Sequence, residues 1–69
     1  MVDVNKLRGI WVSQGLTQSD VAKKIGLSDR VMTSRMSKKW FGSDEIEKMI
    51  ALLNITEPVT IFFANKVTL

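Results

Sequence analysis

Cysteine and histidine are both missing from this sequence, and proline occurs once. Without cysteine the fold has neither a disulfide nor a thiolate metal site. Without histidine the chain lacks the commonest general base and the commonest neutral metal ligand. No serine or acid has an obvious activator, and no glycine-rich phosphate loop is present. We therefore expect no catalytic residue, no metal site, no cofactor and no enzyme activity.

Long hydrophobic runs are also missing. The longest apolar stretch is a few residues, too short to span a bilayer. The opening residues, MVDVNKLRG, lack the basic flank and apolar core of a secretory signal. We expect a cytoplasmic protein with no membrane partner. A single domain of 69 residues buries only about 60% of its unfolded surface. A second subunit is the expected source of added stability.

Charge is unevenly distributed along the chain. Residues 18–40 hold six basic and two acidic side chains, a balance of +4. Residues 41–60 hold one basic and four acidic side chains, a balance of −3. A basic segment beside an acidic one favours a phosphate-binding surface on the first.

The first helix is predicted over residues 4–14, capped by Asp3 or Asn5 and closed by Gly15. The second begins after Thr17, with Asp20 completing a capping box, and ends at Gly26, where positive φ is needed. Its inner face is formed by Val21, Ala22 and Ile25.

A third helix follows Ser28 and runs to residue 37, with Met32 and Met36 facing inward. Its outer face carries hydrogen-bonding groups small enough to enter a DNA groove. Two short helices joined at a glycine, the second with such a face, predict a helix-turn-helix over residues 17–37.

The rest of the chain predicts two more helices. Ser43 caps the fourth, Asn54 ends it, and Thr56-Glu57-Pro58 begins the fifth. Residues 65–69 are predicted as strand or as disordered. The fold class is therefore all-α, with five helices around one core in a single domain of residues 1–69.

Aromatic residues occur in two adjacent pairs. Trp40 and Phe41 are predicted to form a lid between the third and fourth helices, because base stacking needs unpaired bases. Phe62 and Phe63 are expected to be exposed, and exposed apolar patches usually indicate a partner.

The chain resembles the Cro and CI-type repressors of temperate bacteriophages, in the xenobiotic-response-element-like group. The resemblance rests on Leu16-Thr17-Gln18, on VAKKIGLS at residues 21–28, and on Met32. It implies a lambda-repressor-like DNA-binding domain. Residues 41–67 are similar to short regulators of Gram-positive phages. One departure is Arg35, which stands where many relatives return to the core; Met36 supplies that contact here.

By position, the resemblance assigns two sets of DNA contacts. Those expected to reach base edges are Asp29, Arg30, Thr33 and Ser34. Those expected to bind phosphates are Gln18, Ser28, Lys38 and Lys39. Arg30 is the sharpest candidate, since a guanidinium binds O6 and N7 of one guanine together.

Two residues near these contacts have two interpretations each. Asp29 either accepts from a cytosine amino group or only favours the helix N-terminus, and capping is the better-supported interpretation. Val31 either touches a thymine methyl or only packs.

The resemblance also implies a function and a partner. The function is sequence-specific repression in a phage lysogeny switch, by a homodimer bound to a duplex operator in the bacterial cytoplasm. By analogy the dimer surface lies in a tail of residues 55–69, around Ile55, Pro58, Val59 and Phe62. The alternative is an antirepressor or modulator that uses the same fold to bind a phage repressor protein.

Overall fold

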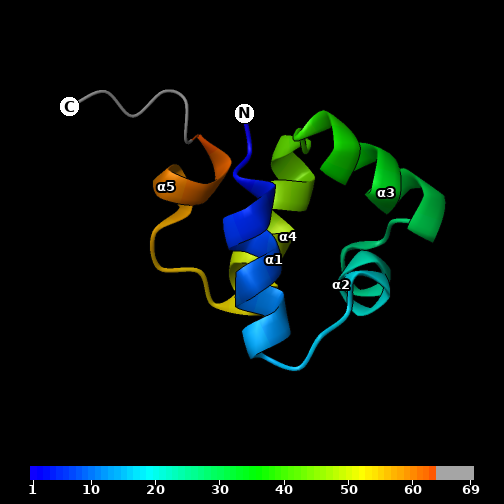
Figure 1. Cartoon of the computed structure of the whole chain (residues 1–69), viewed down its shortest axis with the longest axis horizontal. Coiled ribbons are helices and arrows are strands. Elements are labelled where there is room, and N and C mark those ends of the chain that lie inside the picture. Colours follow the sequence, from blue (N-terminus) through cyan, green and yellow to red (C-terminus); the bar gives the residue numbers. More distant parts are fainter. Residues whose placement is uncertain (64–69) are drawn as a thin grey trace.

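The computed structural model describes residues 1–63, and within them it contains five helices and no strand. They are α1 (Val4–Ser13), α2 (Gln18–Ile25), α3 (Asp29–Lys38), α4 (Ser43–Leu53) and α5 (Pro58–Phe62). Figure 1 shows α1 in the middle, with α2 and α3 on one side and α5 on the other. The predicted all-α class is confirmed for these residues. The predictions for residues 65–69 lie outside them.

The predicted caps of the first three helices are confirmed. Asp3 Oδ1 accepts from a backbone N–H three residues later, at 3.1 Å, and Ser28 Oγ does the same at 3.2 Å. Thr17 and Asp20 bond each other's backbone N–H groups, at 3.1 and 2.9 Å. Hydrogen bonding of the Asp20 carboxylate to the backbone N–H of Thr17, and then to its side chain, lowers the pKa of Asp20. Each helix therefore starts where its local sequence supplies an acceptor.

Helices α1 to α4 each end beside a residue with positive φ. These residues are Gly15 (76°), Gly26 (81°), Lys39 (56°) and Asn54 (54°). The next N–H then reaches back five residues, as Leu27 does to the carbonyl of Ala22 at 2.8 Å. This arrangement satisfies the last carbonyls of each helix. The ends at glycine and asparagine were predicted, whereas Lys39 was predicted to lie in a loop.

Helix α4 starts differently from its prediction. Ser43 was predicted as the cap, but it is the first helical residue and Gly42 is the cap. Glycine offers no side-chain acceptor, so the carboxylate of Glu45 accepts the Gly42 N–H, at 3.0 Å. The predicted cap was wrong by one residue. Glu45, in the third helical position, accepts the N–H of the cap residue as the acid of a capping box does, which needs no serine before the helix.

Helix α5 begins at Pro58, as predicted. The expected exposed pair of phenylalanines is wrong for Phe62, which is 2% exposed, while Phe63 is 45% exposed. Adjacent helical residues point about 100° apart, so one ring of such a pair turns inward when the other turns out. Phe62 belongs to the core.

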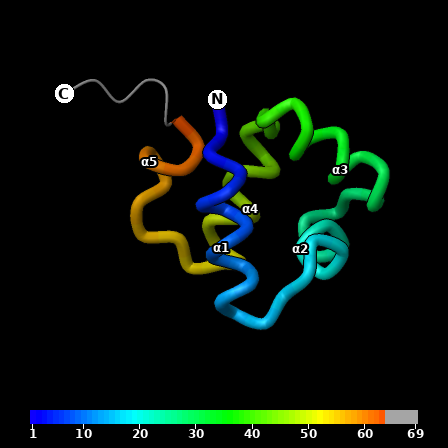
Figure 2. The backbone as a smooth tube through the Cα atoms, viewed as in Figure 1, coloured from blue at the N-terminus to red at the C-terminus, as the bar shows by residue number. Residues whose placement is uncertain are grey.

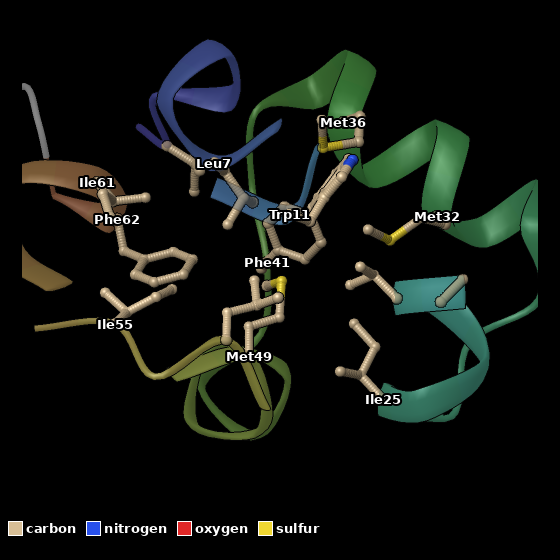
Figure 3. Packing of buried hydrophobic residues seen from close by; sticks show 14 residues of the cluster. Leu7, Trp11, Ile25, Met32, Met36, Phe41, Met49, Ile55, Ile61 and Phe62 are labelled. Carbon is tan, nitrogen blue, oxygen red and sulfur yellow. The ribbon is translucent and has the colours of Figure 1, made fainter. Parts of the chain in front are cut away.

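Trp11 lies at the centre of the core and is 1% exposed. In Figure 3 its indole has Met36 above it, Leu7 on one side and Met32 on the other. All five helices contribute to the buried cluster, and no buried side chain in residues 1–63 is polar. The core positions predicted for Met32, Met36 and Met49 are confirmed. The fold is therefore held by apolar packing around one tryptophan.

The predicted aromatic lid between α3 and α4 is half correct. Phe41 is buried at 3% exposure and closes the core below the corner, while Trp40 is 56% exposed and turns outward. Consecutive residues of an extended segment point to opposite sides. Phe41 alone therefore forms the lid.

The N-terminal residues connect two elements that are distant in sequence. The N–H of Val2 donates to the carbonyl of Lys39 at 2.9 Å, and the N–H of Asp3 donates to the carbonyl of Ile61 at 2.7 Å. Figure 2 shows the start of the chain passing between the end of α3 and α5. These two bonds fix the three segments relative to one another.

Replacing Gly26 by alanine tests the turn between α2 and α3. We expect Gly26→Ala to lower the free energy of unfolding by about 1–2 kcal/mol, since a Cβ strains backbone at positive φ. The control is Gly9→Ala in the middle of α1, where a Cβ would meet nothing within 4 Å. It should raise stability by about 0.5–1 kcal/mol. Urea unfolding followed by tryptophan fluorescence measures both. Equal effects would contradict the assignment.

Candidate nucleic-acid interface

Helices α2 and α3 pack closely across a short turn. Ala22 on α2 is fully buried. Its small side chain lets α3 approach closely. Leu27 in the turn is half-buried and packs against the core. The two helices are also joined outside the core, where the Gln18 amide donates to Thr33 Oγ1 at 3.3 Å. We call residues 18–38 the α2–α3 unit.

Helix α3 has one apolar and one polar face. Met32 and Met36 are buried. Residues spaced by three, four or seven lie on one side of a helix, and on the side opposite the methionines these are Arg30, Ser34, Ser37 and Lys38. All are exposed except Ser34, which is half-buried. Figure 1 shows α3 at the edge of the molecule, so this polar face meets solvent.

Three of the four residues predicted to reach base edges, Arg30, Thr33 and Ser34, lie on or beside this face, whereas Asp29 lies at the start of α3, three residues before Met32 and on the same side. Asp29, Arg30 and Thr33 are exposed and Ser34 is half-buried. Thr33 lies at the border with α2, where its hydroxyl accepts from Gln18. Ser37 was missed, although its spacing of seven from Arg30 places it on the same face. The polar face therefore extends one turn further than was predicted.

The residues predicted to bind phosphates lie at the starts of α2 and α3 and at the end of α3. Gln18 is the first residue of α2 and is half-buried, and its amide N–H is directed to Thr33. Ser28 is exposed, and its hydroxyl caps α3. Lys38 is the last residue of α3 and Lys39 follows it, both exposed. The two helix starts carry partial positive charge and the two lysines carry full charge.

Arg35 forms an ion pair that sequence analysis missed. Its Nε and Nη2 donate to the two carboxylate oxygens of Glu45, at 3.0 and 3.2 Å. The side chains of Arg35 and Glu45 are 27% and 15% exposed. The guanidinium also lies over the exposed Trp40 ring, 5.1 Å from its centroid. This bidentate pair joins α3 to the first turn of α4.

The ion pair shifts the pKa of both partners. The hydrogen bond from Arg35, followed by that from Gly42, holds the pKa of Glu45 below its usual value. The same hydrogen bond, which Arg35 donates and Glu45 accepts, raises the pKa of Arg35. Because Glu45 compensates Arg35, the positive charge of the outer surface rests on Arg30 and on the lysines.

The residues predicted for a dimer surface do not share one surface. Ile55 and Phe62 are buried in the chain's own core, at 9% and 2% exposure. Pro58 is half-buried and Val59 is 54% exposed. Of these four, Val59 offers the most surface to a partner.

No family model matches this chain, and neither do any curated protein or any solved structure. Residues 1–63 contain no group of three or more acids able to hold a metal ion. Within the same residues, no helix has the length and apolar character needed to cross a membrane.

Replacing Glu45 by glutamine tests the ion pair through pH. The pKa of Glu45 is lowered in the folded chain, so the unfolded chain takes up the proton first as pH falls. Its contribution to stability is therefore full above the usual value of 4.5 and is lost as pH falls through the lowered pKa. We expect Glu45→Gln to be less stable than the wild type at about pH 6 and to lose less stability on going to about pH 3.

The matched control is Glu47→Gln, which removes an equal charge from the exposed side of the same helix. Its unfolding free energy should follow the wild type across this range. The lowered pKa of Asp20 contributes equally to the pH dependence of the unfolding free energy in all three proteins. An unchanged pH profile in Glu45→Gln, measured by urea unfolding, would mean that the pair does not form in solution.

Proposed function

We propose that this protein is a sequence-specific DNA-binding transcriptional repressor of the lambda-repressor-like class, in which α2 and α3 are the helix-turn-helix. The observation that carries the proposal is the position of α3. Figure 1 shows this helix at the edge of the fold. Its two methionines are buried, while Arg30 and Ser37 are exposed and Ser34 is half-buried. An exposed polar helix of 10 residues fits the major groove, which is about 12 Å wide.

In this proposal the N-terminal half of α3 contacts base edges. Arg30 donates two hydrogen bonds to O6 and N7 of a guanine, and Thr33 offers a methyl group to thymine and a hydroxyl to a neighbouring base. Thr33 is also held by Gln18, which fixes its rotamer before DNA binds. A side chain ordered in advance loses less entropy on binding.

The starts of α2 and α3 and the end of α3 contact the sugar-phosphate backbone in this proposal. The starts of α2 and α3, at Gln18 and Ser28, present N–H groups and positive dipole ends to phosphates. Lys38 and Lys39 add two charges at the other end of α3. Contacts of this kind set the register of the helix in the groove without distinguishing sequences.

The Arg35–Glu45 pair sets the rotation of α3 about its own axis. Met32 and Met36 allow α3 to roll, because apolar contacts have no direction. A bidentate ion pair has one geometry. With Arg35 tied to α4, Arg30 and Ser34 are held at a fixed angle to the rest of the fold. We infer that Arg35 is a positioning residue and not a DNA contact.

Repression follows from occupancy and needs no chemistry at the site. One domain of this size touches a handful of base pairs, whereas two copies on a two-fold operator double the contact surface. A bound dimer then excludes polymerase from an overlapping promoter.

Selection from random duplexes, followed by Arg30→Ala, tests the base contact. The wild type should enrich a sequence with one guanine that Arg30→Ala no longer prefers, a loss of about 1–3 kcal/mol of discrimination. Lys24→Ala, which removes an exposed cation from α2, should leave the preference unchanged. If no duplex is enriched, the proposal fails, and a repressor-binding modulator becomes the function to test.

Replacing Lys39 by glycine separates stability from DNA binding. Lys39 has φ 56°, so Lys39→Gly should raise the free energy of unfolding by about 1 kcal/mol. It should also weaken DNA binding and lower the slope of log K against log salt by about 1, because one phosphate contact is lost. Binding titrations at several salt concentrations measure the slope.

The control is Asn54→Gly, at the other non-glycine position with positive φ, φ 54°. Asparagine tolerates this conformation better than lysine, so the gain in stability should be smaller. Duplex binding should not change, because Asn54 lies at the C-terminal end of α4, next to Leu53, whose carbonyl accepts from Gln14 at the end of α1, and not at the corner between α3 and α4. Equal DNA binding by Lys39→Gly and the wild type would remove Lys39 from the interface.

A further inference from the structure

The backbone N–H of Val2 contacts the residue that ends α3. It donates to the carbonyl of Lys39 at 2.9 Å. Val2 lies outside the α2–α3 unit, and its side chain is 4% exposed, buried in the same cluster as Phe41 and Phe62. A residue of the core thereby holds the backbone of a residue that was predicted to bind phosphate.

We propose that Val2 is a positioning residue for the phosphate contact of Lys39. Its N–H keeps Lys39 in the backbone conformation that places the lysine charge at the end of α3. The inference rests on the proposed function, in which Lys39 binds a DNA phosphate. It extends that function to a residue that touches no DNA.

The peptide unit between Lys39 and Trp40 is held from both sides. A trans peptide unit is planar, and its carbonyl and its N–H point in opposite directions. The carbonyl of Lys39 accepts from Val2, and the N–H of Trp40 donates to the carbonyl of Arg35 at 3.2 Å. Together these two hydrogen bonds fix the rotation ψ of Lys39, which is 42°.

Lys39 needs this support because its backbone is strained. Its φ is 56°, a left-handed conformation in which the Cβ approaches the following carbonyl oxygen. Such a conformation persists only where the surrounding contacts determine it. Lys38 is the last helical residue, so the hydrogen bonds of α3 already define its backbone. The two neighbouring lysines therefore differ in their dependence on Val2.

Val2 can position Lys39 because Val2 is itself held. The next residue, Asp3, donates its N–H to the carbonyl of Ile61 at 2.7 Å. The Asp3 carboxylate accepts from the N–H of Lys6 at 3.1 Å. These bonds attach the N-terminal residues to α5 and to the first turn of α1, between which they pass in Figure 2. The position of Lys39 is thereby fixed relative to both helices.

Loss of the Val2 N–H should move the charge of Lys39. Without this bond, Lys39 relaxes toward negative φ, and the first bond of its side chain takes a new direction. A lysine ammonium stands at the end of a flexible stem, so the charge then leaves its place beside Lys38. One of the two lysine contacts at the end of α3 is lost, and the other remains.

Replacing Val2 by proline in the full chain tests the inference, because proline lacks the N–H and keeps an apolar side chain. On the duplex that the wild type selects, we expect Val2→Pro to lower the slope of log K against log salt by about 1. The control is Phe62→Leu, which loosens the same buried cluster and leaves the Val2 N–H in place. Its slope should equal that of the wild type.

Two double variants distinguish positioning from a general loosening of the fold. Val2→Pro combined with Lys39→Gly should lower the slope by about 1 and not by about 2, because both changes remove the same phosphate contact. Val2→Pro combined with Lys38→Ala should lower it by about 2, because the two changes remove separate contacts. A general loosening would give both pairs the same result.

Amide hydrogen exchange supplies a second measurement that needs no change at Val2. Coupling between two sites is reciprocal, so a duplex that uses the positioned Lys39 must also stabilise its bond to Val2. Exchange of the Val2 amide should slow by about fivefold or more when the wild type binds the duplex, and not when Lys39→Gly binds it. The control is the amide of Gly15, which donates to Val12 at the other end of α1 and should not respond.

The outcomes separate this inference from the proposed function. If duplexes bind but Val2→Pro keeps the wild-type slope, Val2 does not position Lys39 and the proposed function stands. The same conclusion follows if duplex binding leaves exchange at Val2 unchanged, and this result decides the matter if Val2→Pro does not fold. If the wild type binds no duplex at any salt concentration, the proposed function is wrong and the inference is wrong with it.

Discussion

The packing of Met32 and Met36 against the Trp11 indole is the interaction on which the exposed surface depends. It attaches α3 to the core along one stripe and leaves the opposite stripe in water. Since the chain has no cysteine and therefore no disulfide, α3 is kept in place by this contact and by its junction with α2. A short helix is not stable alone in water, so the polar face of α3 exists only because its apolar face is buried.

Apolar packing fixes the depth of α3, and the Arg35–Glu45 pair fixes its rotation. The same carboxylate also closes the start of α4 by accepting from Gly42. The Glu45 carboxylate thereby joins α3 to the start of α4. It also neutralises Arg35, whose charge would otherwise belong to the outer surface. An ion pair of this kind contributes orientation more than stability, because the gain in attraction is offset by the loss of hydration.

The positive φ of Lys39 sets the direction that the chain takes after α3. It turns the chain so that Trp40 faces outward and Phe41 faces the core, and it directs the Lys39 carbonyl to the N–H of Val2. Glycine would adopt this conformation without strain. A lysine there costs stability and supplies a charge at the end of α3. Strain at such a position is consistent with selection for function over stability.

The sequence alone determined the helices and their order. The caps at Asp3, Thr17 and Ser28 and the ends at Gly26 and Asn54 follow from hydrogen bonds within a few residues, and such bonds are encoded locally. The inward methionines follow from helical spacing for the same reason. Tertiary structure alone decided that Phe62 turns in and Phe63 out, that Arg35 meets Glu45, and that Val2 binds Lys39. Each of these depends on how one segment is rotated against another distant in the chain, and no local pattern of residues specifies that rotation.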